Sequence, residues 1–181
     1  MNQDKLKLAK AKFKRSKNID VCQILMDYIL DCYTILNPCS YGARIEKYVC
    51  KLLNLVTISS KLSLGDFKYK DTFGEFKMSY LSQDLQYHIT HIRQWQKFKY
   101  YLIMFIDCEN DFEPEFYFIP KNVINKFKLS SMVGTQETNL DNQNVDLRVT
   151  IKKGSKEHNL LKKHNLLKGT SIEDIKEYMI K

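Results

Sequence analysis

The chain has 181 residues and a formal net charge of +8, with 44% hydrophobic and 12% aromatic residues. This composition excludes a disordered chain, and the length is most simply that of one domain with a sizeable core. The sequence lacks an apolar run of about 18 residues, and its amino terminus lacks an apolar signal-peptide core. We therefore expect a cytoplasmic protein without a membrane span. Five cysteines without paired spacing are typical of reduced thiols.

The first part of the chain is predicted to be helical. Residues 4–36 carry apolar side chains at spacings of three and four, and the pattern stops at Asn37 and Pro38. A second helix is expected after an N-cap at Ser40. Its apolar stripe consists of Ile45, Val49, Leu52 and Leu53. On this helix Glu46 lies at the edge of the buried face, where it can reach inward.

A mixed sheet is expected in the middle of the chain. The predicted strands are residues 65–69, 73–77, 100–106 and 115–119. The third of these is an almost continuous apolar run, which is typical of a central strand. From Ser82 onward we predict a helix with Leu85, Ile89 and Ile92 on one side. A short helix is expected to follow Pro120.

The last part of the chain changes composition beyond residue 128. A polar, amide-rich loop at 130–144 precedes an alternating strand at 145–151, and Ser171 is expected to cap a closing helix. We treat residues 1–181 as a single domain with a helical amino-terminal region (1–38), a core (40–127) and a carboxy-terminal part (128–181). The element order predicts an α/β fold, a sandwich around one central mixed β-sheet flanked by helices.

Two of the expected strands carry the charged residues Asp66, Glu75 and Lys77. Since side chains alternate along a strand, Glu75 and Lys77 must lie on one face of the sheet, together with Phe73. A hairpin turn beginning at Asp71 can bring Asp66 to the same place. Two carboxylates and a lysine suffice to hold a magnesium ion and activate water. The alternative interpretation is a salt-bridged hairpin on the protein surface.

These residues resemble the core motif of the PD-(D/E)XK nucleases, which is an aspartate at one strand followed by Glu-x-Lys on the next. Gly65 stands where that family usually has a proline. The flanks are also similar to small type II restriction endonucleases: residues 40–53 look like the helix before the motif, and 92–96 leading into 100–107 like the segment after it. The resemblance covers roughly residues 40 to 125. It implies a restriction-endonuclease-like fold.

The resemblance also implies a site. Asp66 and Glu75 would bind Mg²⁺ together with the main-chain carbonyl of Phe76. Lys77 would orient the attacking water or act as a base, and Glu46 would bind a second ion or position water. The expected protein is a magnesium-dependent type II restriction endonuclease that cleaves double-stranded DNA at a short site as a homodimer. Two alternatives remain open: a structure-specific nuclease of the resolvase or repair type, and a noncatalytic DNA-binding subunit with the same fold.

Base recognition needs amide, hydroxyl or arginine side chains at the base edges. The candidates for DNA binding are Gln94, Gln96, Thr135, Gln136, Asn139 and Arg148. For the 130–144 loop the alternative is an ordinary surface loop. Lysines clustered within 5–17 and 152–163 can contact phosphates or form solvated helix faces.

Four other residues are interpreted structurally. His88 and His91 lie three apart on the expected helix, and because no third histidine or cysteine completes a zinc site nearby, we expect structural or phosphate-facing roles. The single tryptophan, Trp95, is expected in the hydrophobic core. Cys50 lies among apolar helical residues and is also expected to fill the core.

Overall fold

The computed structural model describes residues 27–29, 38–59, 62, 64–107, 114–131, 146–167, 175 and 177–178. Its main helices are α3 (Pro38–Leu52), α4 (Lys121–Ile124) and α5 (Lys156–His164). Its strands are β1 (Val56–Thr57), β2 (Phe67–Tyr69), β3 (Thr72–Tyr80), β4 (Gln86–Ile92), β5 (Tyr100–Ile106), β6 (Pro114–Pro120), β7 (Ser130–Ser131) and β8 (Leu147–Lys152).

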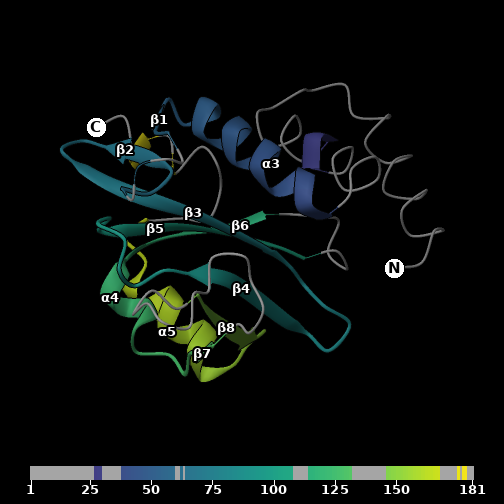
Figure 1. Cartoon of the computed structure of the whole chain (residues 1–181). Helices are drawn as coiled ribbons and strands as arrows, with labels where there is room; N and C mark the ends of the chain where they lie inside the picture. Colours follow the sequence, from purple (N-terminus) through teal and green to yellow (C-terminus); the bar gives the residue numbers. More distant parts are fainter. Residues whose placement is uncertain are drawn as a thin grey trace.

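A mixed sheet of five strands forms the centre of the fold, in the order β1-β2-β3-β5-β6 (Figure 1). Strands β3 and β5 are parallel, whereas the other neighbouring strands are antiparallel. The structure is therefore α/β with a central mixed sheet, as the sequence predicted. The prediction of one sheet was incomplete, because β4, β8 and β7 form a second, antiparallel sheet.

Helix α3 covers one face of the central sheet (Figure 1). Three of the four residues of its predicted apolar stripe are buried, Ile45, Val49 and Leu53, with Cys50 beside them. The fourth, Leu52, is half-buried against the same core. The helix begins at Pro38, so Ser40 lies inside it and is not the predicted N-cap. Proline suits the first turn of a helix because the N–H that it lacks has no partner there.

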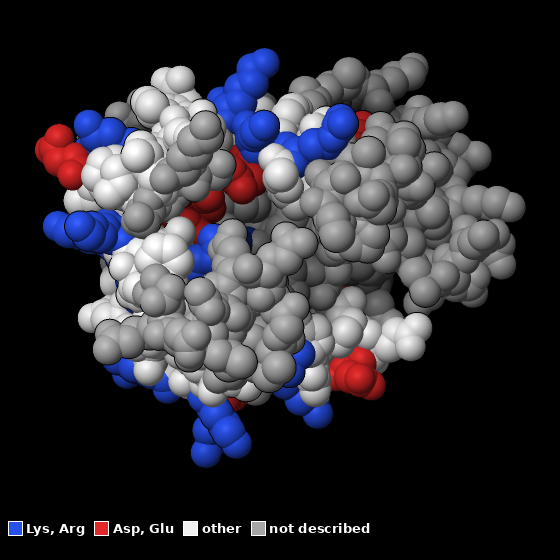
Figure 2. Space-filling model, viewed as in Figure 1, with Lys and Arg blue, Asp and Glu red and all other residues white. Residues whose placement is uncertain are grey.

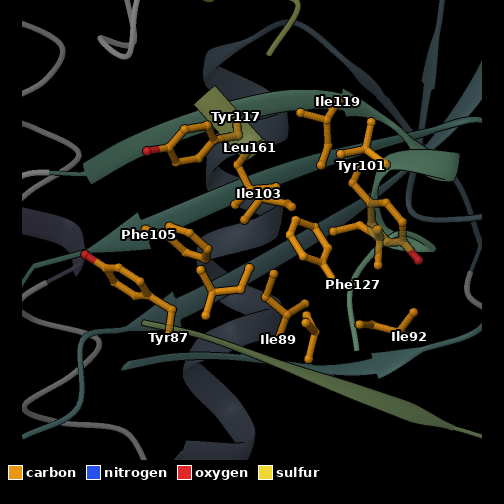
Figure 3. Packing of buried hydrophobic residues seen from close by; sticks show 14 of the residues in the cluster. Tyr87, Ile89, Ile92, Tyr101, Ile103, Phe105, Tyr117, Ile119, Phe127 and Leu161 are labelled. Carbon is orange, nitrogen blue, oxygen red and sulfur yellow. The ribbon is translucent and has the colours of Figure 1, made fainter. Parts of the chain in front are cut away.

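The second sheet covers the opposite face of the central sheet (Figures 1 and 3). Along β5, side chains at even positions from 102 to 106 join the core under α3, and those at odd positions from 101 to 105 join the core between the sheets. In this second core Tyr87 of β4 stacks on Phe105 of β5, with ring centroids 4.0 Å apart. Strand β5 is thus apolar on both faces because both faces are buried.

The helix predicted from Ser82 is wrong, since the segment forms strand β4. Leu85, Ile89 and Ile92 match helical spacing, but Leu85 lies in the turn before the strand and is 42% exposed. Tyr87 and Ile89, two residues apart, are both buried against the central sheet. The period of two decides the structure here because the second sheet offers strand partners that a local sequence pattern cannot reveal.

The prediction that Trp95 lies in the core is also wrong. Trp95 is 40% exposed in the turn between β4 and β5, and Phe98 fills the nearby core position at 4% exposure. The turn is tied to the rest of the fold by Lys121, whose ammonium donates to the main-chain carbonyls of Gln94 and Gln96. Because these hydrogen bonds hold the main chain of the turn, Trp95 need not pack in the core to fix it and can lie at the surface.

The carboxy-terminal part matches the prediction in part. The expected strand at 145–151 corresponds to β8, but helix α5 was missed; Ser155 caps it by accepting a hydrogen bond from the N–H of His158 at 3.2 Å. Within the expected helices at 4–36 and after Ser171, the described positions 27–29, 175, 177 and 178 are helical. None of the described helices is long and apolar enough to cross a membrane.

Two glycine substitutions test this packing. A Cβ at Gly74 would lie 2.3 Å from the ring of Phe67, which is fully buried and cannot move away. We expect Gly74→Ala to lower the free energy of unfolding by about 1–3 kcal/mol, as overpacking does. At Gly42 in α3, no atom of the described residues outside the helix's own backbone and the two chain neighbours lies within 4 Å of the Cβ position. Gly42→Ala should raise stability by about 0.5–1 kcal/mol. Urea unfolding of both variants checks this, and equal effects would contradict the packing.

Candidate active site

Asp66 lies just before β2 and fastens the β2–β3 hairpin. Its N–H donates to the carbonyl oxygen of Gly74 at 2.9 Å, and its Oδ2 accepts from the N–H of Phe76 at 2.9 Å. Pairing between β2 and β3 ends with Phe67 opposite Gly74. The carboxylate therefore takes the place of a strand partner where β2 ends, and this bond fixes its position against β3.

Gly65 is required by the turn that delivers Asp66. Its φ is +100°, and an added Cβ would lie 2.4 Å from the carbonyl oxygen of Gly74. Proline locks φ near about −65° and cannot adopt this conformation. The proline usual in the resembling nucleases is therefore incompatible with this turn, which accounts for glycine at this position.

Glu75 and Lys77 lie on the same face of β3, as their spacing predicted. The Lys77 ammonium donates to Glu75 Oε1 at 2.7 Å. Glu75 is only 4% exposed, and its Oε2 is buried without a hydrogen-bond partner among the described residues. A buried carboxylate oxygen left without a donor is costly, so this atom is a natural position for a bound cation.

Glu46 of α3 belongs to the same cluster. Burial raises its pKa to about 7, assisted by the negative charges of Asp66 and Glu75 and opposed by Lys77. The Glu46 carboxyl group on the helix therefore lies within electrostatic range of the charged residues of the hairpin. All four residues were predicted from the sequence. Hydrogen bonds join Asp66 to the backbone of β3 and Lys77 to Glu75, whereas Glu46 interacts with them through charge.

The cluster lies among basic groups. Burial and the charge of Glu75 raise the pKa of Asp66 to about 6, whereas Lys77, the Phe76 N–H and Arg93 act in the opposite direction. Figure 2 shows acidic atoms recessed near the middle of this face, with basic side chains around them. A recessed carboxylate cluster within a basic surface can hold a cation while an anionic substrate approaches.

The donor set suits a hard divalent cation. Within the described part of the chain, no group of three or more His, Cys, Asp or Glu side chains is arranged to hold a metal ion. An ion would instead use Asp66, Glu75 and the main-chain carbonyl of Phe76, with water and substrate completing its coordination. The N–H of Phe76 already points to Asp66, and the carbonyl of a strand residue points to the same side as its N–H. Few protein oxygens and several waters are typical of Mg²⁺.

The predicted DNA-binding residues are only partly described. Gln94 is exposed and its side chain donates to Asn125 Oδ1 at 3.0 Å. Gln96 is half-buried, and Arg148 is exposed on β8. The remaining candidates lie outside the described residues; they are Thr135, Gln136 and Asn139. The structure therefore places Gln94 and Gln96 in one turn and Arg148 on a different sheet.

The two histidines of β4 pair with β8 or with the residue before it. The Nδ1 atom of His88 lies 3.1 Å from Thr150 Oγ1, and that of His91 lies 2.8 Å from Asp146 Oδ2. Arg93 donates to the other oxygen of Asp146 at 3.0 Å. Asp146 is 2% exposed, so these contacts stabilise the second sheet, in line with a structural role.

Sequence reasoning missed three groups near the cluster. Burial lowers the pKa of Lys121 and raises that of Tyr101, and the charge of Glu75 opposes the first shift and adds to the second. The charge of Arg93 opposes the burial that raises the pKa of Asp66. Tyr101 lies opposite Glu75 in the parallel β3–β5 pair. That register, once known, would have identified Tyr101. No local sequence pattern identifies Lys121, because tertiary structure and not a sequence motif determines its position.

Comparison with protein-family models gave no match, and comparison with curated proteins gave no relative either. The functional argument therefore depends on the geometry of the cluster and on the motif resemblance.

The raised pKa of Glu46 predicts how its substitution changes stability with pH. An acid whose folded pKa lies above its unfolded value stabilises the fold below the unfolded pKa, and this contribution is lost as pH rises through the folded pKa. For Glu46 the loss falls between pH 4.5 and about 7. Glu46→Gln should therefore stabilise the protein at about pH 8 relative to about pH 4, by roughly 1–2 kcal/mol after solvent screening.

Urea unfolding of wild type and variant at both pH values measures this difference. Glu157→Gln is a matched control, because Glu157 is exposed on α5 and its pKa is lowered rather than raised. The control should show no gain at the higher pH. A pH-independent effect of Glu46→Gln would mean that Glu46 does not share the electrostatic environment of the cluster.

Proposed function

We propose that this protein is a magnesium-dependent DNA endonuclease of the restriction type that cleaves double-stranded DNA at a short specific site as a homodimer. The observation that carries the proposal is the convergence of Asp66, Glu75 and Lys77 on two joined strands, with Glu46 arriving from α3. The net charge of +8 favours a polyanionic substrate. The two-fold symmetry of a dimer would match a palindromic site.

Each residue has a chemical task in this proposal. When bound, Mg²⁺ would stabilise charge on the cleaved phosphate and lower the pKa of a bound water. Asp66 and Glu75 provide oxygen ligands, and the ammonium of Lys77, held by Glu75 at 2.7 Å, donates to a phosphate oxygen and orients the attacking water. The water oxygen bonds to phosphorus, one P–O ester bond breaks, a neighbouring carboxylate takes the water proton, and the leaving oxygen is protonated from solvent.

Cleavage of unmethylated phage-sized DNA tests the proposal. In Mg²⁺ the wild type should give discrete bands, and chelator should abolish them. Glu75→Gln and Lys77→Ala should each reduce the cleavage rate by about 100-fold or more, because both remove a group that contacts the reacting phosphate or its metal. Lys68→Ala is the matched control, since Lys68 is an exposed lysine on the neighbouring strand β2 and should retain full activity.

Circular dichroism and metal-free DNA binding would show that the inactive variants remain folded. Intact DNA with wild type under all conditions would exclude cleavage of ordinary duplex. Cleavage confined to branched or damaged DNA would favour a structure-specific nuclease. Binding without any cleavage, unchanged in Glu75→Gln, would favour a noncatalytic DNA-binding subunit.

A further inference from the structure

A groove of about 660 Å³ crosses the end of the central sheet where β5 begins and β6 ends. Its walls combine lysines, amides and apolar rings, and they come from the β4–β5 turn, α4 and the segment after α5. The lining residues include Gln94, Phe98, Lys99, Lys121 and Asn125. A volume within about 300–1,000 Å³ fits a single small ligand rather than a length of duplex.

The groove is joined to the carboxylate cluster through the backbone and through Lys121. The N–H of Lys99 donates to the carbonyl of Phe73 on β3 at 2.9 Å, and the N–H of Lys121 donates to the carbonyl of Lys99 at 2.8 Å. Two lining residues of the groove are thus hydrogen-bonded in series to β3, two residues before Glu75. Burial lowers the pKa of Lys121, and the charge of Glu75 acts in the opposite direction. Lys99 is exposed at the groove, where its ammonium can contact a phosphate.

Lys121 also orders one wall of the groove. Its Nζ donates to the carbonyls of Gln94 and Gln96, at 2.8 and 2.6 Å, and lies 4.4 Å from the ring centroid of Phe98. Three contacts from one ammonium hold the β4–β5 turn against the start of α4. This leaves the side chain of Gln94 in a defined position at the groove.

An amide pair lies at this wall. Gln94 Nε2 donates to Asn125 Oδ1 at 3.0 Å, so Gln94 Oε1 and Asn125 Nδ2 remain as an acceptor and a donor for a ligand. Reversing both amides would leave the same two functions. Each of these two atoms can bind a complementary group on a nucleobase edge, because amide oxygens accept from and amide nitrogens donate to the bases.

We propose that this groove holds one nucleotide of the DNA substrate outside the base stack, next to the cleaved phosphodiester, with its base edge bound by Gln94 and Asn125. This inference rests on the proposed nuclease function and deepens it, because it assigns a substrate feature and two specificity-determining residues. A nucleotide leaves the duplex at a cost of a few kcal/mol, and the cost is smaller where the base is unpaired. Substrates with an unpaired nucleotide should therefore bind more tightly.

The probes are fluorescent duplexes of identical sequence, either fully paired or with a one-nucleotide bulge of A, C, G or T, measured by anisotropy in chelator. Wild type should bind the preferred bulged duplex about fivefold or more tightly than the paired one and should rank the four bulged bases. Gln94→Ala and Asn125→Ala should each bring the four affinities within about twofold. Gln83→Ala and Asn159→Ala are matched controls, exposed and not among the groove-lining residues, and should keep the ranking.

Equal binding of bulged and paired duplexes by wild type would overturn the inference, and so would a base ranking that survives in both groove variants. These outcomes are distinct from failure of the proposed function, which is scored by cleavage in Mg²⁺. Base-dependent binding without cleavage would support nucleotide binding in the groove and contradict the proposed nuclease activity. Cleavage by wild type, together with an unchanged base preference in the groove variants, would support the nuclease activity and contradict nucleotide binding in the groove.

Discussion

The hydrogen bond from the N–H of Phe76 to the carboxylate of Asp66 is the interaction on which the site depends. It continues the contact between the two hairpin strands after their main-chain pairing ends at Gly74. The same bond holds a carboxylate at an open strand edge and directs the backbone of β3 toward it. A side chain that replaces a strand partner thus serves both the fold and the proposed chemistry.

Burial gives this cluster its electrostatic character. Asp66 and Glu46 both have raised pKa values, at about 6 and about 7, because they share a partly desolvated space with Glu75. Carboxylates brought this close destabilise one another when ionised, and Lys77 offsets only part of the repulsion. Such an arrangement is costly for a structural hairpin, and a bound cation would offset the repulsion. This contrast favours the catalytic interpretation over a surface ion pair.

The two sheets contribute different residues to the region around the cluster. The central sheet carries the hairpin residues of the cluster, and its strand β5 is buried on both faces. The second sheet and the β4–β5 turn bring Arg93, Gln94 and, through Lys121, the groove to the same region. The region between cluster and groove is therefore assembled from segments that are far apart in the sequence, which is typical of binding sites formed where elements meet.

The sequence by itself determined the α3 stripe, the hairpin with Glu75 and Lys77 on one face, and the buried strands β5 and β6, because each depends on local periodicity and on alternation of side chains. It also named the four residues of the cluster. Only the tertiary structure decided that residues 86–92 form a strand, that Trp95 is exposed, and that Lys121 and Asn125 line the same groove. Those outcomes depend on partners contributed by distant segments, and no local pattern records such partners.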